Sequence, residues 1–162
     1  MAATDPPLNR PGTEKPASHH SPLTLVETNT LLRRAIQKLP AEIRGSIVLR
    51  CDELARLQGN EEAIENAFSR LLQMIVEERQ TGKQLFLHIT CSQQKEEDTI
   101  PSGLPRFFIR FHTNLSPSAS WMQEAESRIN NIASFLLPYG GSLLVNQLKN
   151  SGCVFCITLP GK

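Results

Sequence analysis

The stretch GNEEAIENAFSRLLQMIVEE, from Gly59 to Glu78, restricts the possible folds of this chain more than any other. Apolar residues recur in it every three or four positions, which predicts an amphipathic helix with one broad core-facing side. They are Ala63, Ile64, Ala67, Phe68, Leu71, Leu72, Ile75 and Val76. Asn60 suits the N-cap, and the acids that follow it complement the helix dipole. Met74 borders the apolar side, where methionine usually fills packing gaps.

Other patterns in the sequence predict further helices and strands before and after this helix. Helices are expected over residues 28–39 and 121–137, and strands over 84–90, 106–112, 142–148 and 153–159. Residues 46–60 have an extended pattern, and residues 92–105 form a polar connection with a short charged tip at 95–98. We therefore expect an α+β fold, a two-layer α/β sandwich. Its mixed, mostly antiparallel sheet packs against about three helices.

Composition indicates one globular domain after a tail. The chain has 162 residues, 40% of them hydrophobic and 20% charged, with a formal net charge of +1, which favours neither nucleic acid nor an anionic membrane as partner. No apolar run approaches the ~20 residues of a membrane span, and no signal peptide is visible, so we expect a cytoplasmic protein without membrane insertion. Residues 1–22 hold five of the eleven prolines and predict a disordered tail, leaving residues 23–162 as the domain.

The cysteines and histidines do not form a recognisable metal or catalytic site. Cys153 and Cys156 are three apart in a predicted strand, so they face opposite sides and cannot readily hold one zinc ion. Cys51 and Cys91 stand alone in predicted strands or strand ends, and we expect all four thiols to be reduced. His19 and His20 lie in the tail, where weak metal binding is a lesser alternative to a flexible polar segment. His88 and His112 lie on or beside strands.

The long helix resembles the one that opens the ATPase domain of histidine kinases (the GHKL or HATPase family). That family's pattern is G-D-x-x-x-L-x-Q-V-L-x-N-L-L-x-N-A-I, and Gly59-Asn60 and Leu71-Leu72 match it. The segment YGGSLLVNQLKNSGCVFCITLP resembles the family's closing H-G-G-x-I-x-V-x-S and G-x-G-[ST]-x-F-x-[FV]-x-L-P. Its matches are Gly140, Gly141, Val145, Gly152, Phe155, Ile157, Leu159 and Pro160. The resemblance covers residues 23–162 and implies the Bergerat-like ATPase fold.

The same resemblance implies that the magnesium-binding residue is missing. The two asparagines of the helix motif fall on Arg70 and Met74. In the family the second asparagine coordinates the magnesium ion of bound ATP. A methionine thioether cannot replace it, because magnesium requires hard oxygen ligands.

Both glycine boxes of the family are also replaced. Its D-x-G-x-G, which supplies an aspartate for adenine, corresponds to the stretch from His112 to Ser116, with Asn114 and Ser116 at the two glycine positions. The glycines of its G-x-G-L box, which cradle the phosphates, become Glu126 and Arg128. A glutamate at this place would repel a triphosphate.

The resemblance therefore implies a degenerate ATPase-like domain of bacterial signal transduction, a pseudo-ATPase or pseudokinase. We expect no catalytic residues, lost or weak binding of ATP and magnesium, and action through a protein partner, with a two-component signalling protein favoured. One alternative is binding of a nucleotide or other small ligand in the remnant ATP cleft. A second is an unorthodox catalytic module of a two-component sensor kinase. The sequence indicates no oligomeric state.

The lid that kinases fold over ATP corresponds to a short connection, residues 115–120, without glycine. It leads into Trp121, the single tryptophan. We expect this side chain to pack near the former cleft and help close it, or to serve as an exposed anchor for a partner. The alternative is a helix-start residue that simply docks on the core.

Overall fold

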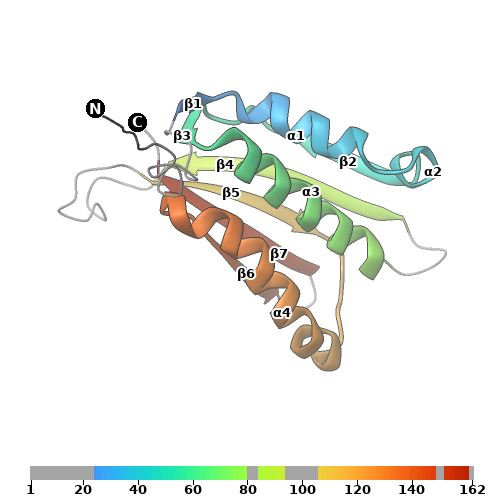
Figure 1. The fold of residues 1–162 in the computed structure, drawn as a ribbon. Coiled ribbons are helices and arrows are strands. Elements are labelled where there is room, and N and C mark those ends of the chain that lie inside the picture. Colours follow the sequence, from blue (N-terminus) through green and yellow to red (C-terminus); the bar gives the residue numbers. More distant parts are fainter. Residues whose placement is uncertain (1–23, 80–83, 94–105, 149–151, 161–162) are drawn as a thin grey trace, which may run out of the picture.

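The computed structural model describes residues 24–79, 84–93, 106–148 and 152–160, in which a layer of helices covers one face of a five-stranded sheet (Figure 1). In chain order the elements are β1 (Thr24–Val26), α1 (Thr28–Gln37), α2 (Ala41–Arg44), β2 (Ile47–Cys51), β3 (Leu57–Gly59), α3 (Glu61–Glu78), β4 (Leu85–Gln93), β5 (Arg106–Thr113), α4 (Ala119–Leu136), the 3-10 turn η3 (Leu137–Tyr139), β6 (Ser142–Leu148) and β7 (Gly152–Pro160). The expected two-layer α+β architecture is confirmed.

The main sheet has the strand order β2-β4-β5-β7-β6. β2 runs parallel to β4, and the other neighbours are antiparallel. A small second sheet pairs β1 with β3. The sheet is therefore mixed and mostly antiparallel, as the sequence predicts.

Alternation along the strands gives the sheet a covered face under the helices and an open face on the other side. In β4, Leu85, Leu87 and Ile89 are buried, whereas Phe86 between them is exposed. In β5, Ile109 and Phe111 face the core in the same way. Residues two apart share a face of a strand, so these apolar positions form one continuous core surface.

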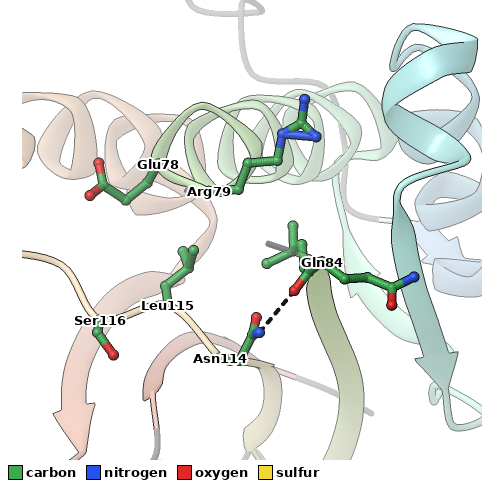
Figure 2. Close-up of a pocket in the computed structure, with 7 residues that line it drawn as sticks. Glu78, Arg79, Gln84, Asn114, Leu115 and Ser116 are labelled. Atoms are coloured by element: carbon green, nitrogen blue, oxygen red, sulfur yellow. Dashed lines mark hydrogen bonds between the residues drawn. The ribbon is translucent and has the colours of Figure 1, made fainter. Parts of the chain in front are cut away.

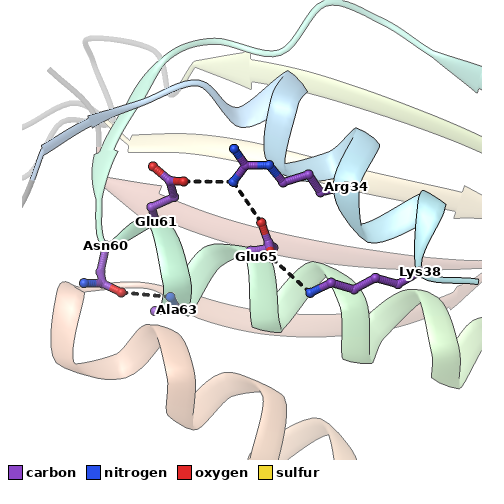
Figure 3. A network of polar contacts seen from close by, with 6 residues as sticks. All are labelled: Arg34, Lys38, Asn60, Glu61, Ala63 and Glu65. Carbon is purple, nitrogen blue, oxygen red and sulfur yellow. Dashed lines mark hydrogen bonds and ion pairs between the residues drawn. The ribbon is translucent and has the colours of Figure 1, made fainter.

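Polar contacts fix α1 against α3 (Figure 3). Arg34 of α1 lies 2.9 Å from the Glu61 carboxylate and 3.2 Å from that of Glu65, and Lys38 lies 2.9 Å from Glu65. Hydrogen bonds from Lys38 and Arg34 lower the pKa of Glu65. At the start of α3, the Asn60 side chain accepts a hydrogen bond from the Ala63 amide at 2.8 Å, as expected of an N-cap.

Some boundaries differ from the sequence expectations for local reasons. α4 begins at Ala119, two residues early, because the Ser118 hydroxyl accepts a hydrogen bond from the Trp121 amide and caps the helix. β4 continues to Gln93, into the predicted connection. The short elements β1 and α2 were not predicted, since three or four residues carry too little periodicity. The predicted tail (1–22) and charged tip (95–98) lie outside the described residues.

Gly152 makes the closest backbone approach in this part of the sheet. Its φ angle is +102°, and a Cβ atom there would lie 1.9 Å from the carbonyl oxygen of Thr113 in β5. No L-residue adopts this φ without strain, and a backbone oxygen cannot move aside as a flexible side chain can. The start of β7 therefore requires glycine.

We predict that Gly152→Ala lowers the free energy of unfolding by about 2 kcal/mol or more, through backbone strain and this clash. Gly45→Ala is the matched control, because a Cβ there meets its nearest atoms at 3.6 Å and 3.7 Å, and should change stability by less than about 0.5 kcal/mol. Urea unfolding of both variants measures the difference. Equal stability of the two would contradict the assigned geometry.

Candidate functional site

The seven positions that the resemblance assigns to the former nucleotide site do not meet in one pocket. Some line a groove between two helices, some line a small pocket at the end of a strand, and others face the core, the solvent or the open sheet face. They are Arg70, Met74, His112, Asn114, Ser116, Glu126 and Arg128. Their surroundings show what each can do.

Arg70 and Arg128 meet in a groove of about 430 Å³ between α3 and α4. Its lining residues are Arg70, Gln73, Ser127, Arg128, Asn131 and Ile132. The Arg70 guanidinium lies 5.2 Å from the centre of the Phe135 ring of α4. Arg128 lies 3.1 Å from the carboxylate of Glu77 in α3. Each arginine thus contacts the facing helix, and both contacts lie at the solvent-exposed side of the groove, where such contacts add little to stability.

Met74 and Glu126 do not line this groove. Met74 is 0% exposed and belongs to the core cluster, although Gln73 beside it is exposed and lines the groove. The packing interpretation of Met74 is confirmed. Glu126 is exposed on α4. Position 74 therefore offers a buried thioether and no oxygen ligand.

Asn114 and Ser116 line a pocket of only about 60 Å³ at the end of β5 (Figure 2). Small-ligand pockets begin near 300 Å³, so this space is too small for a nucleotide. The Asn114 side chain is already engaged, because it accepts a hydrogen bond from the Phe86 amide at 2.9 Å and donates one to the Gln84 carbonyl at 3.0 Å. It ties β5 to the start of β4.

The connection between β5 and α4 is packed against the rest of the domain. Leu115 is 5% exposed and joins the core, and Pro117 is also buried. The Pro117 carbonyl accepts a hydrogen bond from the Gln147 side chain of β6 at 3.0 Å. On the opposite wall of the pocket, burial and the nearby Glu124 raise the pKa of Glu78.

His112 lies on the open face of the sheet and lines neither the groove nor the small pocket. It is directly opposite His88 of β4, and the ring centres are 5.9 Å apart. The His88 ring lies 3.1 Å from Asp52, and the His112 ring 3.3 Å from the Thr90 hydroxyl. Burial lowers the pKa of His112, and His88 and Arg110 lower it further.

The residue at the end of β5 that does face the helices is Thr113, which the sequence comparison passed over. Its hydroxyl donates to the Cys153 carbonyl at 2.8 Å and accepts from the Leu115 amide at 3.3 Å. The signal was present in the sequence. Phe107, Ile109 and Phe111 alternate toward the core, so the next core-facing position is 113 and not 112.

Trp121 is half-buried near the start of α4 and packs against the core. It does not line the groove between α3 and α4. The structure therefore agrees with the third alternative, a helix-start residue docked on the core. Arg70 and Arg128, rather than Trp121, make the contacts that join α4 to α3.

Cys153 and Cys156 face opposite sides of β7, as predicted. Cys153 lies on the covered face opposite Thr113, and Cys156 on the open face opposite Arg110. Burial raises the pKa of Cys153 to about 11, so its thiol stays protonated at neutral pH. Across the described ranges, no three His, Cys, Asp or Glu side chains are grouped so that they could hold a metal ion. Nor does any helix in these ranges have the length and apolar character needed to cross a membrane.

Comparison with known proteins identifies the fold. Neither a protein-family model nor a curated protein matches the chain. Among solved structures, it is similar to the nucleotide-free catalytic domain of histidine kinase ThkA (19% identity, TM-score 0.62, 86% of this chain and 95% of that one). It is also similar to the ATP-binding domain of PrrB from Mycobacterium tuberculosis (17% identity, TM-score 0.59, 86% of this chain and 98% of that one). A third similar structure is Acinetobacter baumannii histidine kinase AdeS (8% identity, TM-score 0.65, 91% of this chain and 72% of that one). The chain thus has the fold of a histidine-kinase catalytic domain, as the sequence resemblance implies.

We predict that His112 makes stability depend on pH. Because folding lowers the pKa of His112, the unfolded chain binds a proton there more readily, and stability falls as the pH drops below the ordinary value of 6.5. The loss ends once folded His112 is protonated too. Urea unfolding between about pH 7.5 and pH 5 should show a shallower decline for His112→Gln than for the unmodified chain. His20→Gln, in the predicted tail, should keep the original slope; equal slopes for all three would exclude this role.

Proposed function

We propose that this chain, with its histidine-kinase ATPase fold, is a non-catalytic signalling domain that works by binding another protein. The proposal rests on the side chains at and beside the groove between α3 and α4. Met74 is fully buried where the resemblance places the magnesium ligand, and Arg70 and Arg128 make contacts across the two helices. Position 74 supplies no oxygen ligand for magnesium, and we therefore expect no magnesium-dependent ATP chemistry.

On this proposal, residues 23–162 form a pseudo-ATPase domain behind a disordered tail. It acts in the cytoplasm of a bacterium, with a two-component signalling protein as the favoured partner. The burial of the connection between β5 and α4 supports the same proposal. A catalytic domain must open for its nucleotide, whereas buried Leu115 and Pro117 fix this connection in place.

We predict that ATP with magnesium will neither stabilise the protein nor be hydrolysed. A ligand present at 100 times its Kd should add about 2.7 kcal/mol to the free energy of unfolding, which a thermal shift detects easily. The experiment compares unfolding with ATP–magnesium, with ATP and a chelator, and without nucleotide. Magnesium-dependent stabilisation would contradict the proposal, and hydrolysis would point to the unorthodox catalytic module.

We predict that Met74→Asn, which restores the family's residue, will not restore nucleotide binding and will destabilise the fold. The change empties core volume and buries an amide, and should lower the free energy of unfolding by about 3 kcal/mol. Gln73→Asn is the matched control. It places the same side chain one position away, on the exposed side of α3, and should change stability by less than about 0.5 kcal/mol. Magnesium-dependent ATP binding by Met74→Asn would show that the cleft is intact.

A second candidate function is binding of a nucleotide or other small ligand in the remnant cleft without magnesium. The groove between α3 and α4 favours it, because its volume of about 430 Å³ falls in the usual range for ligands and two guanidinium groups line it. Stabilisation by ATP in the presence of a chelator, and its loss in both Arg70→Ala and Arg128→Ala, would support this candidate over the first.

A further inference from the structure

Strand β6 forms an edge of the main sheet that carries no protecting charge. It is the outermost strand beyond β7, on the side of the molecule opposite β2 (Figure 1). Its seven residues, SLLVNQL, include no charged residue and no proline. Within the described residues its backbone pairs with β7 alone, so the outward N–H and C=O groups are open to another strand.

Apolar side chains accompany this open backbone. Leu144 is 61% exposed and Leu148 is 43% exposed, and both belong to the residues of β6 that face the open side of the sheet. Proteins usually guard such edges with lysine, proline or an inward-pointing charge. A neutral, seven-residue edge with exposed leucines is therefore a pairing surface.

The other edge strand of the sheet, β2, does contain a charged residue. β2 also exposes an apolar residue on the open face, Val48, at 41%. However, β2 carries Arg50, whose side chain is largely exposed and lies 4.0 Å from Asp52 just after the strand. A charged residue follows each edge strand, Asp52 after β2 and Lys149 after β6, but only β2 carries a charge within the strand. Arg50 opposes pairing of β2 with another chain, which favours β6 as the interface.

We propose that β6 pairs antiparallel with β6 of a second copy of this chain, so that the two sheets become continuous. An edge strand is self-complementary in this arrangement, because a two-fold axis perpendicular to the sheet brings each strand against itself in the opposite direction. Open-face residues of one copy then lie beside open-face residues of the other copy. If the strands pair along their full length, the axis passes near the middle of β6, so Leu144 and Asn146 lie close to it. With a formal net charge of +1, two copies repel each other little. The proposal does not depend on whether the domain binds a nucleotide.

Sedimentation equilibrium of the full chain, from low micromolar to near-millimolar concentration, tests this interface. The unmodified chain should show a monomer–dimer equilibrium. Leu144→Lys and Leu144→Glu should each raise the dimer dissociation constant at least about tenfold, because like charges on paired strands repel. An equimolar mixture of the two should dimerise more strongly than either alone. Val48→Lys, at a comparably exposed site on β2, should leave the dissociation constant unchanged.

Hydrogen exchange distinguishes strand pairing from other contacts. Backbone amides of residues 142–148 should gain protection as the concentration rises through the dimer dissociation constant. A chain that stays monomeric throughout would overturn the proposal; if these amides were nevertheless protected, a segment of the same chain would occupy the edge. A dimer that responds to Val48→Lys and not to Leu144→Lys would also overturn it.

Discussion

The structure depends on the burial of one side of α3 against the sheet. Phe68 of α3 meets Phe111 of β5 edge to face, with ring centres 5.9 Å apart, at the middle of the covered face. α1 packs on one flank of α3 with Leu31 and Leu32 in the core, and α4 packs on the other flank with Ile132 in the core. Exposed ion pairs of Glu65 and Arg128 supplement this packing. Since every long helix touches α3, the position of α3 sets the positions of the others.

The same burial determines what the former cleft can do. A ligand site needs polar groups that point into a pocket that core side chains do not fill. Here Met74 and Leu115 belong to the core, and the arginines of the groove are engaged by Phe135 and Glu77. Side-chain packing and contacts between helices occupy these positions.

The sequence predicts the fold better than the site, for a physical reason. Periodicity reports which residues face the core, so α3, the longer strands and the opposed directions of Cys153 and Cys156 were predictable. A site depends on which side chains meet in space, which motif spacing alone does not report. The resemblance assigns the adenine-site position to His112, which lies on the open face, whereas its neighbour Thr113 lies on the covered face. The engagement of Arg70 by Phe135 joins residues far apart in sequence, and no local pattern indicates it.

The order of pairing in the sheets has a consequence for synthesis of the chain. β1 pairs with β3, β2 pairs with β4, and α1 packs on α3, so each of the first elements has its partner later in the sequence. On the ribosome, the apolar side of α1, including Leu31 and Leu32, therefore emerges before anything that can cover it. Parallel pairing of β2 with β4 must also wait until the whole of α3 has been made, because α3 lies in the crossover between them. The first elements of the chain therefore gain their native partners only once α3 and β4 have been made.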